Sequence, residues 1–126
     1  KLKPSKNDKI IIKKGIQILN KSNSYNHVQA LVINNSKIVS LEKRKGTMDM
    51  LKSIRNNKLH NKLLLKIPKS KQDLRVDLPT IGLETLKDCK KAYIKGIVVK
   101  AGHNIFLDKH KALKFADKNN IFVIAI

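Results

Sequence analysis

The sequence predicts an α/β fold, a single domain in which a mixed sheet is layered with alternating helices and hairpins. Apolar runs of strand length alternate along the chain with segments whose apolar residues recur at helical spacing. Two strand-like runs flank the turn residues Asn34-Asn35-Ser36, which predicts a hairpin and therefore a sheet that is not purely parallel. At 126 residues the chain has the size of one domain and can bury roughly two thirds of its unfolded surface.

The amino-terminal half is expected to form a helix, a hairpin, a second helix and a strand. The segments are 8–20 for the first helix, 28–33 and 37–41 for the hairpin, 48–55 for the second helix and 62–67 for the strand. Asp8 stands where a side chain can cap the first helix. Thr47 can accept a free N–H at the start of the second helix, and Asp49 lies in its first turn, where the helix dipole favours an acid.

The carboxyl-terminal half continues the alternation with two helices and three strands. The segments are 83–93 for a helix, 96–99 and 104–107 for two strands, 108–116 for the last helix and 121–126 for a final strand. The two neighbouring strands are expected to be joined as a second hairpin at Ala101-Gly102-His103, and Asp108 is placed to cap the last helix. Residues 1–7 are interpreted as the end of an upstream linker and residues 8–126 as the domain.

A formal charge of +19 limits the partners that the composition favours. Three of the 28 basic residues are arginines and five residues are aromatic, so the arginine forks and stacking rings typical of a nucleic-acid surface are scarce. The lysines are spread along the chain, which indicates a solvated basic surface that attracts anions, including acidic lipid headgroups by about 1 kcal/mol per lysine. No apolar run approaches the ~20 residues of a membrane span. We expect a cytoplasmic protein with peripheral attraction to membranes and with no nucleic-acid partner.

Common catalytic signatures are missing from the sequence. The four histidines lack the spacing of a zinc site, and the serines lack a G-x-S-x-G context. Neither a P-loop nor a dinucleotide-binding fingerprint occurs. Cys89, the one cysteine, falls in a helical pattern and is expected to be a small core residue rather than a nucleophile.

The segment from Gln72 to Gly82 concentrates charged side chains in a chain with nine acids. In an extended segment Asp73, Arg75 and Asp77 fall on one face, because side chains alternate along a strand. The proline and glycine that follow predict a turn that opens a helix near Gly82, whose free N–H groups would face a bound phosphate. Such a place suits a phosphate and a hard metal ion.

These residue types suit metal-assisted cleavage of a phosphoric anhydride. Asp73 and Asp77 can supply oxygen ligands for Mg²⁺ or Mn²⁺. The cations over the developing phosphate charge would be Arg75, Lys66 and Lys69. Because strand residues four apart stand about 13 Å apart, either the segment bends or one carboxylate binds the metal while the other orients the arginine. The alternative is a surface ladder of ion pairs that contributes little to stability.

Several motifs together carry a resemblance to a known family. The central stretch, Lys66 to Gly82, reads K-x-x-K-x-x-Q-D-x-R-x-D-L-P-T-I-G. The flanking motifs are Gln29-Ala30, Leu41-Glu42, Gly46-Thr47, Gly96 to Gly102, Leu107-Asp108 and Ile121-Phe122-Val123. With these motifs the chain resembles the UDP-2,3-diacylglucosamine pyrophosphatases of lipid A biosynthesis, of the type unrelated to calcineurin-like phosphoesterases.

The resemblance implies the C-terminal domain of a two-domain hydrolase whose N-terminal Rossmann-like domain is absent from this sequence. Such an enzyme uses a divalent cation to hydrolyse UDP-2,3-diacylglucosamine to UMP and 2,3-diacylglucosamine 1-phosphate (lipid X), by water attack at the sugar-side phosphorus. The implied assembly is a homodimer in the cytoplasm of a Gram-negative bacterium, at the inner face of the inner membrane, with lipid and nucleotide between the domains. The isolated domain is then expected to be inactive.

Carried over residue by residue, the resemblance assigns Asp73 and Asp77 as catalytic and metal-binding carboxylates, with Asp77 the leading one. It assigns the remaining site residues to substrate or phosphate binding: Arg75, Lys66, Lys69, Gln72, Thr80 and Thr47. The chain departs from the family pattern at Lys45 and Met48, where the family has acids, and Asp49 stands one residue out of register, a rotation of about 100° on a helix. A non-catalytic domain that binds a UDP-sugar or lipid phosphate is therefore the second hypothesis, and nucleic-acid binding is the third.

Overall fold

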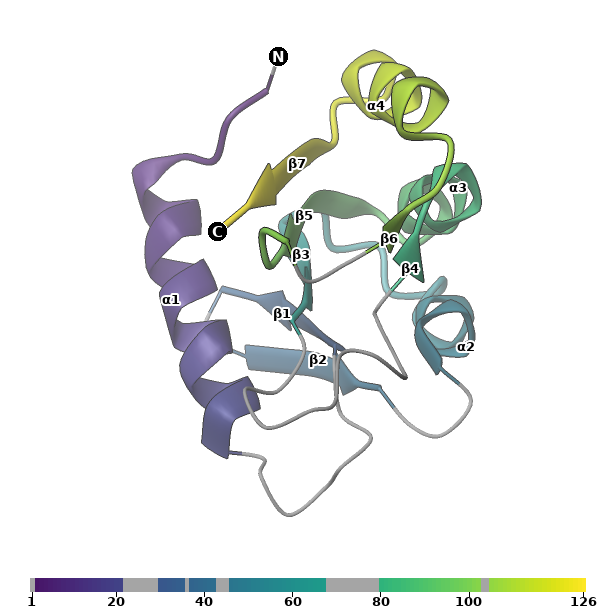
Figure 1. Cartoon of the computed structure of the whole chain (residues 1–126). Coiled ribbons are helices and arrows are strands. Elements are labelled where there is room, and N and C mark those ends of the chain that lie inside the picture. Colours follow the sequence, from purple (N-terminus) through teal and green to yellow (C-terminus); the bar gives the residue numbers. More distant parts are fainter. Residues whose placement is uncertain (1, 22–29, 36, 43–45, 68–79, 103–104) are drawn as a thin grey trace.

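The computed structural model describes residues 2–21, 30–35, 37–42, 46–67, 80–102 and 105–126. In these ranges the chain forms a five-stranded mixed sheet with helices on both faces, and a second sheet of two short strands (Figure 1). The elements are α1 (Lys6–Lys21), β1 (Ala30–Asn34), β2 (Lys37–Leu41), α2 (Gly46–Ser53), β3 (Lys62–Lys66), β4 (Thr80–Ile81), α3 (Leu83–Lys91), β5 (Ile94–Val99), β6 (Ile105–Phe106), α4 (Lys109–Lys118) and β7 (Phe122–Ala125). The predicted α/β class is confirmed, and the predicted helices and strands appear with ends that differ by at most two residues wherever both ends are described. The predicted strand starts at residues 28 and 104 lie outside the described residues.

The main sheet runs in the order β2-β1-β3-β5-β7. Strand β1 is antiparallel to both of its neighbours, whereas β3, β5 and β7 are parallel to one another. Helices α3 and α4 lie in the crossover connections that parallel neighbours require. The mixed pairing that the first hairpin predicted is therefore confirmed.

Helices cover both faces of the sheet, α1 on one face and α2, α3 and α4 on the other (Figure 1). Strand β3 shows the two faces, because Leu63 and Leu65 join the apolar cluster under α1 and Leu64 joins the larger cluster on the opposite side. All five residues of β3 are buried, including the lysines at its two ends, Lys62 and Lys66. A strand covered on both faces is normally apolar, so two buried ammonium groups require polar partners.

The second predicted hairpin does not form. Strand β5 pairs with β3 and β7, whereas β6 pairs in parallel with β4, Ile81 lying opposite Phe106. The Leu107 N–H donates to the Ile81 carbonyl at 2.8 Å and extends this pairing. Turn residues between two strands show that the chain turns, but they do not decide which strand becomes the partner. The small sheet instead joins the start of α3 to the start of α4.

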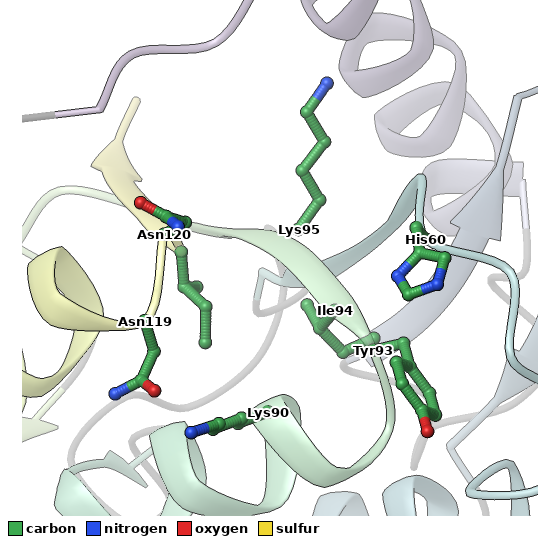
Figure 2. A pocket seen from close by; sticks show the side chains of 8 residues that line it. His60, Lys90, Tyr93, Ile94, Lys95, Asn119 and Asn120 are labelled. Atoms are coloured by element: carbon green, nitrogen blue, oxygen red, sulfur yellow. The ribbon is translucent and has the colours of Figure 1, made fainter.

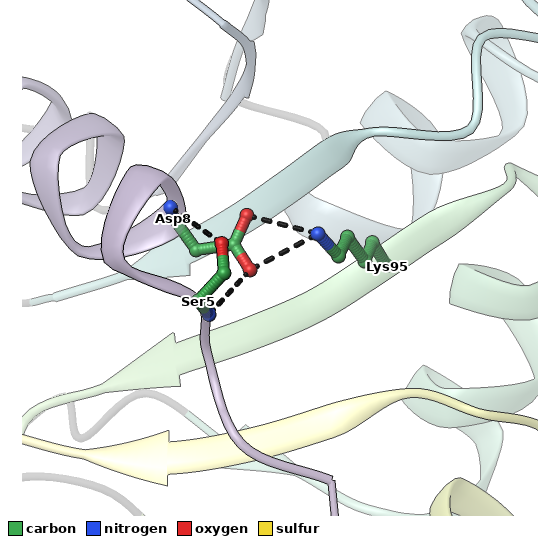
Figure 3. A network of polar contacts seen from close by, with 3 residues as sticks. All are labelled: Ser5, Asp8 and Lys95. Carbon is green, nitrogen blue, oxygen red and sulfur yellow. Dashed lines mark hydrogen bonds and ion pairs between the residues drawn. The ribbon is translucent and has the colours of Figure 1, made fainter.

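Helix α1 begins at Lys6, and its cap is Ser5 rather than the predicted Asp8. The Asp8 N–H donates to Ser5 Oγ at 3.1 Å and the Ser5 N–H donates to Asp8 Oδ2 at 2.9 Å, the reciprocal pair of a capping box. Lys95 Nζ donates to Asp8 Oδ1 at 3.1 Å (Figure 3). Burial raises the pKa of Asp8, but the hydrogen bonds from Ser5 and the contact with Lys95 outweigh it, so the pKa is lowered. This network fastens α1 to β5.

Two other predicted caps make different contacts. Asp108 occupies the cap position of α4 with φ 46°, but its carboxylate makes no capping hydrogen bond. Helix α2 begins at Gly46, whose φ of 88° suits glycine, so Thr47 lies inside the helix. The sequence pattern located both helix starts, but not the partner of either side chain.

Candidate functional site

The carboxyl ends of β3 and β5 define the corner of the molecule at which the described site residues meet. The register places Ala30, Lys66 and Val99 side by side on β1, β3 and β5. The Glu42 N–H donates to the Ala30 carbonyl at 3.0 Å, which adds Glu42 to the same row. Residues in one row face the same side of a sheet, so Glu42 and Lys66 face α2 and α3 with about 10 Å between their backbones. In open α/β sheets, ligands bind at this edge.

Lys66 is the cation of this corner. It is buried, with 9% of its surface exposed, and its Nζ donates to the Thr80 carbonyl oxygen at 2.7 Å. Because Thr80 begins β4, this bond links the main sheet to the small sheet. The Lys66 charge also reaches the thiol of Cys89 in α3: burial and Asp88 raise the pKa of Cys89, and Lys66 opposes them. The ammonium group therefore lies near the inner side of α3.

Glu42 is the carboxylate of this corner. The Thr47 hydroxyl donates to Glu42 Oε1 at 2.8 Å, and Thr47 is buried. The bond joins the chain after β2 to the first turn of α2, where the helix dipole favours a negative charge. Sequence analysis did not select Glu42 as a site residue, although the Leu41-Glu42 pair in the family-like flank was a signal that could have found it.

Helix α3 starts at this corner, as predicted. Its N-cap is Gly82, whose N–H donates to Thr85 Oγ1 at 3.2 Å. A Cβ at position 82 would stand 3.1 Å from the Leu107 carbonyl oxygen, so the close approach of the chain before α4 selects glycine. A helix start of this kind presents N–H donors and a positive dipole end to an anion.

Three of the eight predicted site residues lie in the part of the chain that the structure describes: Lys66, Thr80 and Thr47. Lys66 and Thr80 are in direct contact, and Thr47 forms the neighbouring contact with Glu42. The other five lie outside the described residues: Lys69, Gln72, Asp73, Arg75 and Asp77. Their roles, and the extended form predicted for their segment, stay predictions.

Helix geometry bears on the departures from the family pattern. Met48 and Asp49 are both exposed on α2, whereas Thr47 is buried against Glu42. Asp49 follows Thr47 by two positions, so its side chain is rotated by about 200° around the helix. It lines a small cavity of about 90 Å³ with Ser40 of β2. Helix geometry thus places Asp49 on a different face of α2 from Thr47.

A larger cavity, of about 310 Å³, lies at the other end of the strands, where β5 begins (Figure 2). The Nζ of Lys95 turns away from this cavity and binds Asp8, and the Asn119 amide donates to the Phe115 carbonyl at 2.8 Å. The carboxyl ends of α3 and α4 meet here, and their negative dipole ends disfavour an anion. We therefore do not place the phosphate site in this cavity.

The residues that sequence analysis set aside behave as expected where they are described. Cys89 is fully buried, and burial raises the pKa of its thiol, so it is a core residue. His60 and His110 are exposed, and the other two histidines lie outside the described ranges. Among the described residues, no group of three or more His, Cys, Asp or Glu side chains is placed to hold a metal ion. The helices of the described ranges are too short or too polar to cross a bilayer.

The fold and this corner define an α/β domain that brings a cation, a carboxylate and a helix start together at the carboxyl edge of a mixed sheet. The LpxI C-terminal domain family matches residues 1–124, and the chain belongs to that family. A similar protein is the UDP-2,3-diacylglucosamine pyrophosphatase LpxI of Caulobacter vibrioides (strain ATCC 19089 / CIP 103742 / CB 15), which is 31% identical over 106 residues. The match covers 78% of this chain and 38% of the Caulobacter protein, so the chain spans about two fifths of that relative. The resemblance drawn from the motifs is confirmed.

Proposed function

We propose that the chain supplies the C-terminal part of a site that hydrolyses the pyrophosphate bond of UDP-2,3-diacylglucosamine to UMP and 2,3-diacylglucosamine 1-phosphate. The family match over residues 1–124 carries this proposal, and the name of the Caulobacter relative, a UDP-2,3-diacylglucosamine pyrophosphatase, supports the substrate. Because the chain spans 38% of that relative, the activity is proposed for the whole protein, in which an N-terminal domain completes the site.

The residues of the central motif take the roles that their chemistry suits. Asp77 and Asp73 are the proposed catalytic carboxylates, since a carboxylate can accept the proton of an attacking water. The proposed substrate contacts are Arg75, Lys66, Lys69, Gln72, Thr80 and Thr47. Cations and helix N–H groups stabilise charge that develops on phosphate oxygens. The described corner supports this assignment, because it holds the Lys66 ammonium group and the start of α3.

A divalent cation, Mg²⁺ or Mn²⁺, fits the donor types of the motif, because hard cations take carboxylate oxygens as ligands. Asp73 and Asp77 would hold the ion, which would neutralise charge on the diphosphate. Among the described residues, Glu42 offers a further carboxylate, in the same row of the sheet as Lys66.

The proposal is tested with the full-length protein by following UMP release from UDP-2,3-diacylglucosamine. Asp77→Asn is expected to lower kcat by at least about 100-fold, and EDTA to abolish turnover. Asp49→Asn is the matched control, because it makes the same change at an exposed carboxylate on a different face of α2 from Thr47. The control should keep kcat within about twofold of the wild type. An equal loss in both variants would contradict the assignment of the motif.

The second candidate function is a binding domain that holds the same ligand without turnover. Lys45 and Met48, which stand where the family has acids, favour it. An intact protein that binds UDP-2,3-diacylglucosamine but releases no UMP under saturating Mg²⁺ or Mn²⁺ would decide for this alternative. Residues 1–126 alone are expected to be inactive, and full hydrolysis by this piece would refute the need for a second domain.

We also propose a homodimer that works in the cytoplasm at the inner face of the inner membrane. The lipid substrate and the charge of +19 support attraction to acidic headgroups. Sedimentation with anionic but not neutral vesicles, weakened by salt, is the expected result. Light scattering of the full-length protein tests the dimer.

A further inference from the structure

We propose that Lys66 is a positioning residue: by holding the Thr80 carbonyl, it fixes the end of the segment that carries Asp73 and Asp77 in the sequence. The proposal rests on the proposed function, because it explains how the same site is held in place. The observation behind it is the 2.7 Å bond from Lys66 Nζ to the Thr80 oxygen.

Strand β4 needs such a support. It consists of Thr80 and Ile81, it lies outside the main sheet, and it pairs with β6, which is also two residues long. Two-stranded sheets of this size are not stable by themselves. Ile81 is buried in the core, but Thr80 is exposed. Core packing therefore anchors Ile81, and the bond from Lys66 contributes an anchor for Thr80.

Lys66 stands on a rigid part of the molecule. Strand β3 is the middle strand of the main sheet, and all five of its residues are buried. A hydrogen bond from an ammonium group is shorter and about twice as strong as a neutral one. The Lys66–Thr80 bond also connects the two borders of residues 68–79, because Lys66 ends β3 and Thr80 begins β4. The bond therefore fixes Thr80, the first described residue after that segment, relative to β3.

This role differs from a plain phosphate contact. A lysine has three N–H donors, so a bond to Thr80 is compatible with a further contact to a diphosphate. A contact made equally with bound substrate and transition state changes KM, whereas misplaced catalytic groups lower kcat. The two roles therefore predict different kinetics.

The test compares Lys66→Met with Lys62→Met in the full-length protein. Lys62 is the matched control, because it is a buried lysine on the same face of β3 that also donates to a backbone carbonyl, that of Asn57. Lys66→Met is expected to lower kcat by about 30-fold or more, because the Thr80 bond is lost, and loss of a further contact to the diphosphate would raise KM in addition. Amide exchange of peptides that span β4 and β6 should become about tenfold faster. Lys62→Met should change neither quantity.

Two further variants keep the test decisive. Lys66→Arg retains a cation with N–H donors and should recover part of both kcat and the exchange protection. Should Lys66→Met fail to fold, Lys66→Gln replaces it, because its shorter side chain does not reach Thr80. A raised KM with unchanged kcat, or unchanged exchange across β4 and β6, would overturn the proposal. The exchange measurement needs no turnover, so it judges Lys66 even where the wild type releases no UMP and the proposed function fails.

Discussion

The two ends of β3 carry the same residue, a buried lysine that faces the same side of the sheet, and they differ in what each lysine holds. Lys62 donates to the carbonyl of Asn57, five positions earlier, and lies 5.6 Å from the centre of the Tyr93 ring. Lys66 donates to the carbonyl of Thr80, 14 positions later and close to the far end of the central stretch. A buried lysine therefore does not indicate function by itself. The segment that it holds decides which end is structural and which serves the site.

The surroundings of Lys62 support a structural role for the amino end. The His60 ring packs edge-on against Tyr93 with 5.1 Å between ring centres. Tyr93 adopts φ 59°, a conformation that packing must hold in place for an aromatic residue. Nearby, the Asp8–Lys95 pair ties α1 to β5. These contacts join the residues around the amino end of β3 to one another.

A substitution at Leu64 tests whether β3 is one rigid strand, and it has the largest expected effect on stability. Leu64 is fully buried in the larger core cluster, between the two lysines. Leu64→Ala is expected to lower the free energy of unfolding by about 3 kcal/mol, because it removes apolar contacts and leaves a cavity. Urea unfolding followed by circular dichroism measures the loss. Leu64→Met, which conserves volume, should cost less than about 1.5 kcal/mol. Equal values for the two variants would argue against a tightly packed strand.

The amino end is fastened by the Asp8 network, and Asp8→Asn should weaken stability but not kcat. We expect a loss of about 1–2 kcal/mol near neutral pH, because the capping box and an ion pair to a partly exposed lysine are both disturbed. The pKa of Asp8 is lowered, so its stabilisation is complete above the ordinary carboxyl value of 3.8 and disappears as pH falls through the lowered pKa. The unfolding curves of wild type and variant should therefore converge in acid. A constant difference at all pH values would contradict the charged state of Asp8.

At the corner where β3 ends, Thr47→Val should lower the free energy of unfolding by about 1 kcal/mol, because it removes the hydroxyl that donates to Glu42. The isosteric change leaves the packing of the buried position almost unaltered. Thr47→Ser keeps the donor and is the matched control. Thermal unfolding of both variants measures the effect. A stable Thr47→Val variant with unchanged kcat and unchanged KM would remove Thr47 from the candidate site.

Local patterns in the sequence were sufficient for most of the fold, and pairing across the chain was not. Apolar periodicity located the helices, and the turn residues located the hairpin of β1 and β2. The partner of β6 could not be read, because any strand with an apolar face is a candidate partner. Asp8 was predicted as the cap of the first helix. The capping box that Ser5 and Asp8 form together was recognised only when the structure showed that the helix starts at Lys6.

The same limit applies to the candidate site. Lys66 was found because charged side chains stand out in the sequence, and Thr80 was found through the resemblance to the family. The bond between them was not, since the acceptor is a backbone carbonyl that any residue would supply. Glu42 was missed although the Leu41-Glu42 pair was part of the resemblance, because its place in the row of Lys66 follows from strand pairing that the sequence does not show.

The smallest predicted effect concerns the charge of Lys62 and its dependence on pH. Burial lowers the pKa of Lys62 from its ordinary value of 10.5. Between the lowered pKa and 10.5 the unfolded chain binds more protons than the folded one, so this lysine makes the free energy of unfolding rise with pH in that window. Below the window its unfavourable contribution is constant. In Lys62→Met the contribution is gone, so the stability of the wild type relative to this variant should increase from neutral pH to about pH 10.5. Groups that titrate equally in both proteins cancel in the difference. Urea unfolding of the two proteins across this range measures the difference in stability. A difference that does not change with pH would mean that Lys62 is as well solvated in the folded protein as in the unfolded chain.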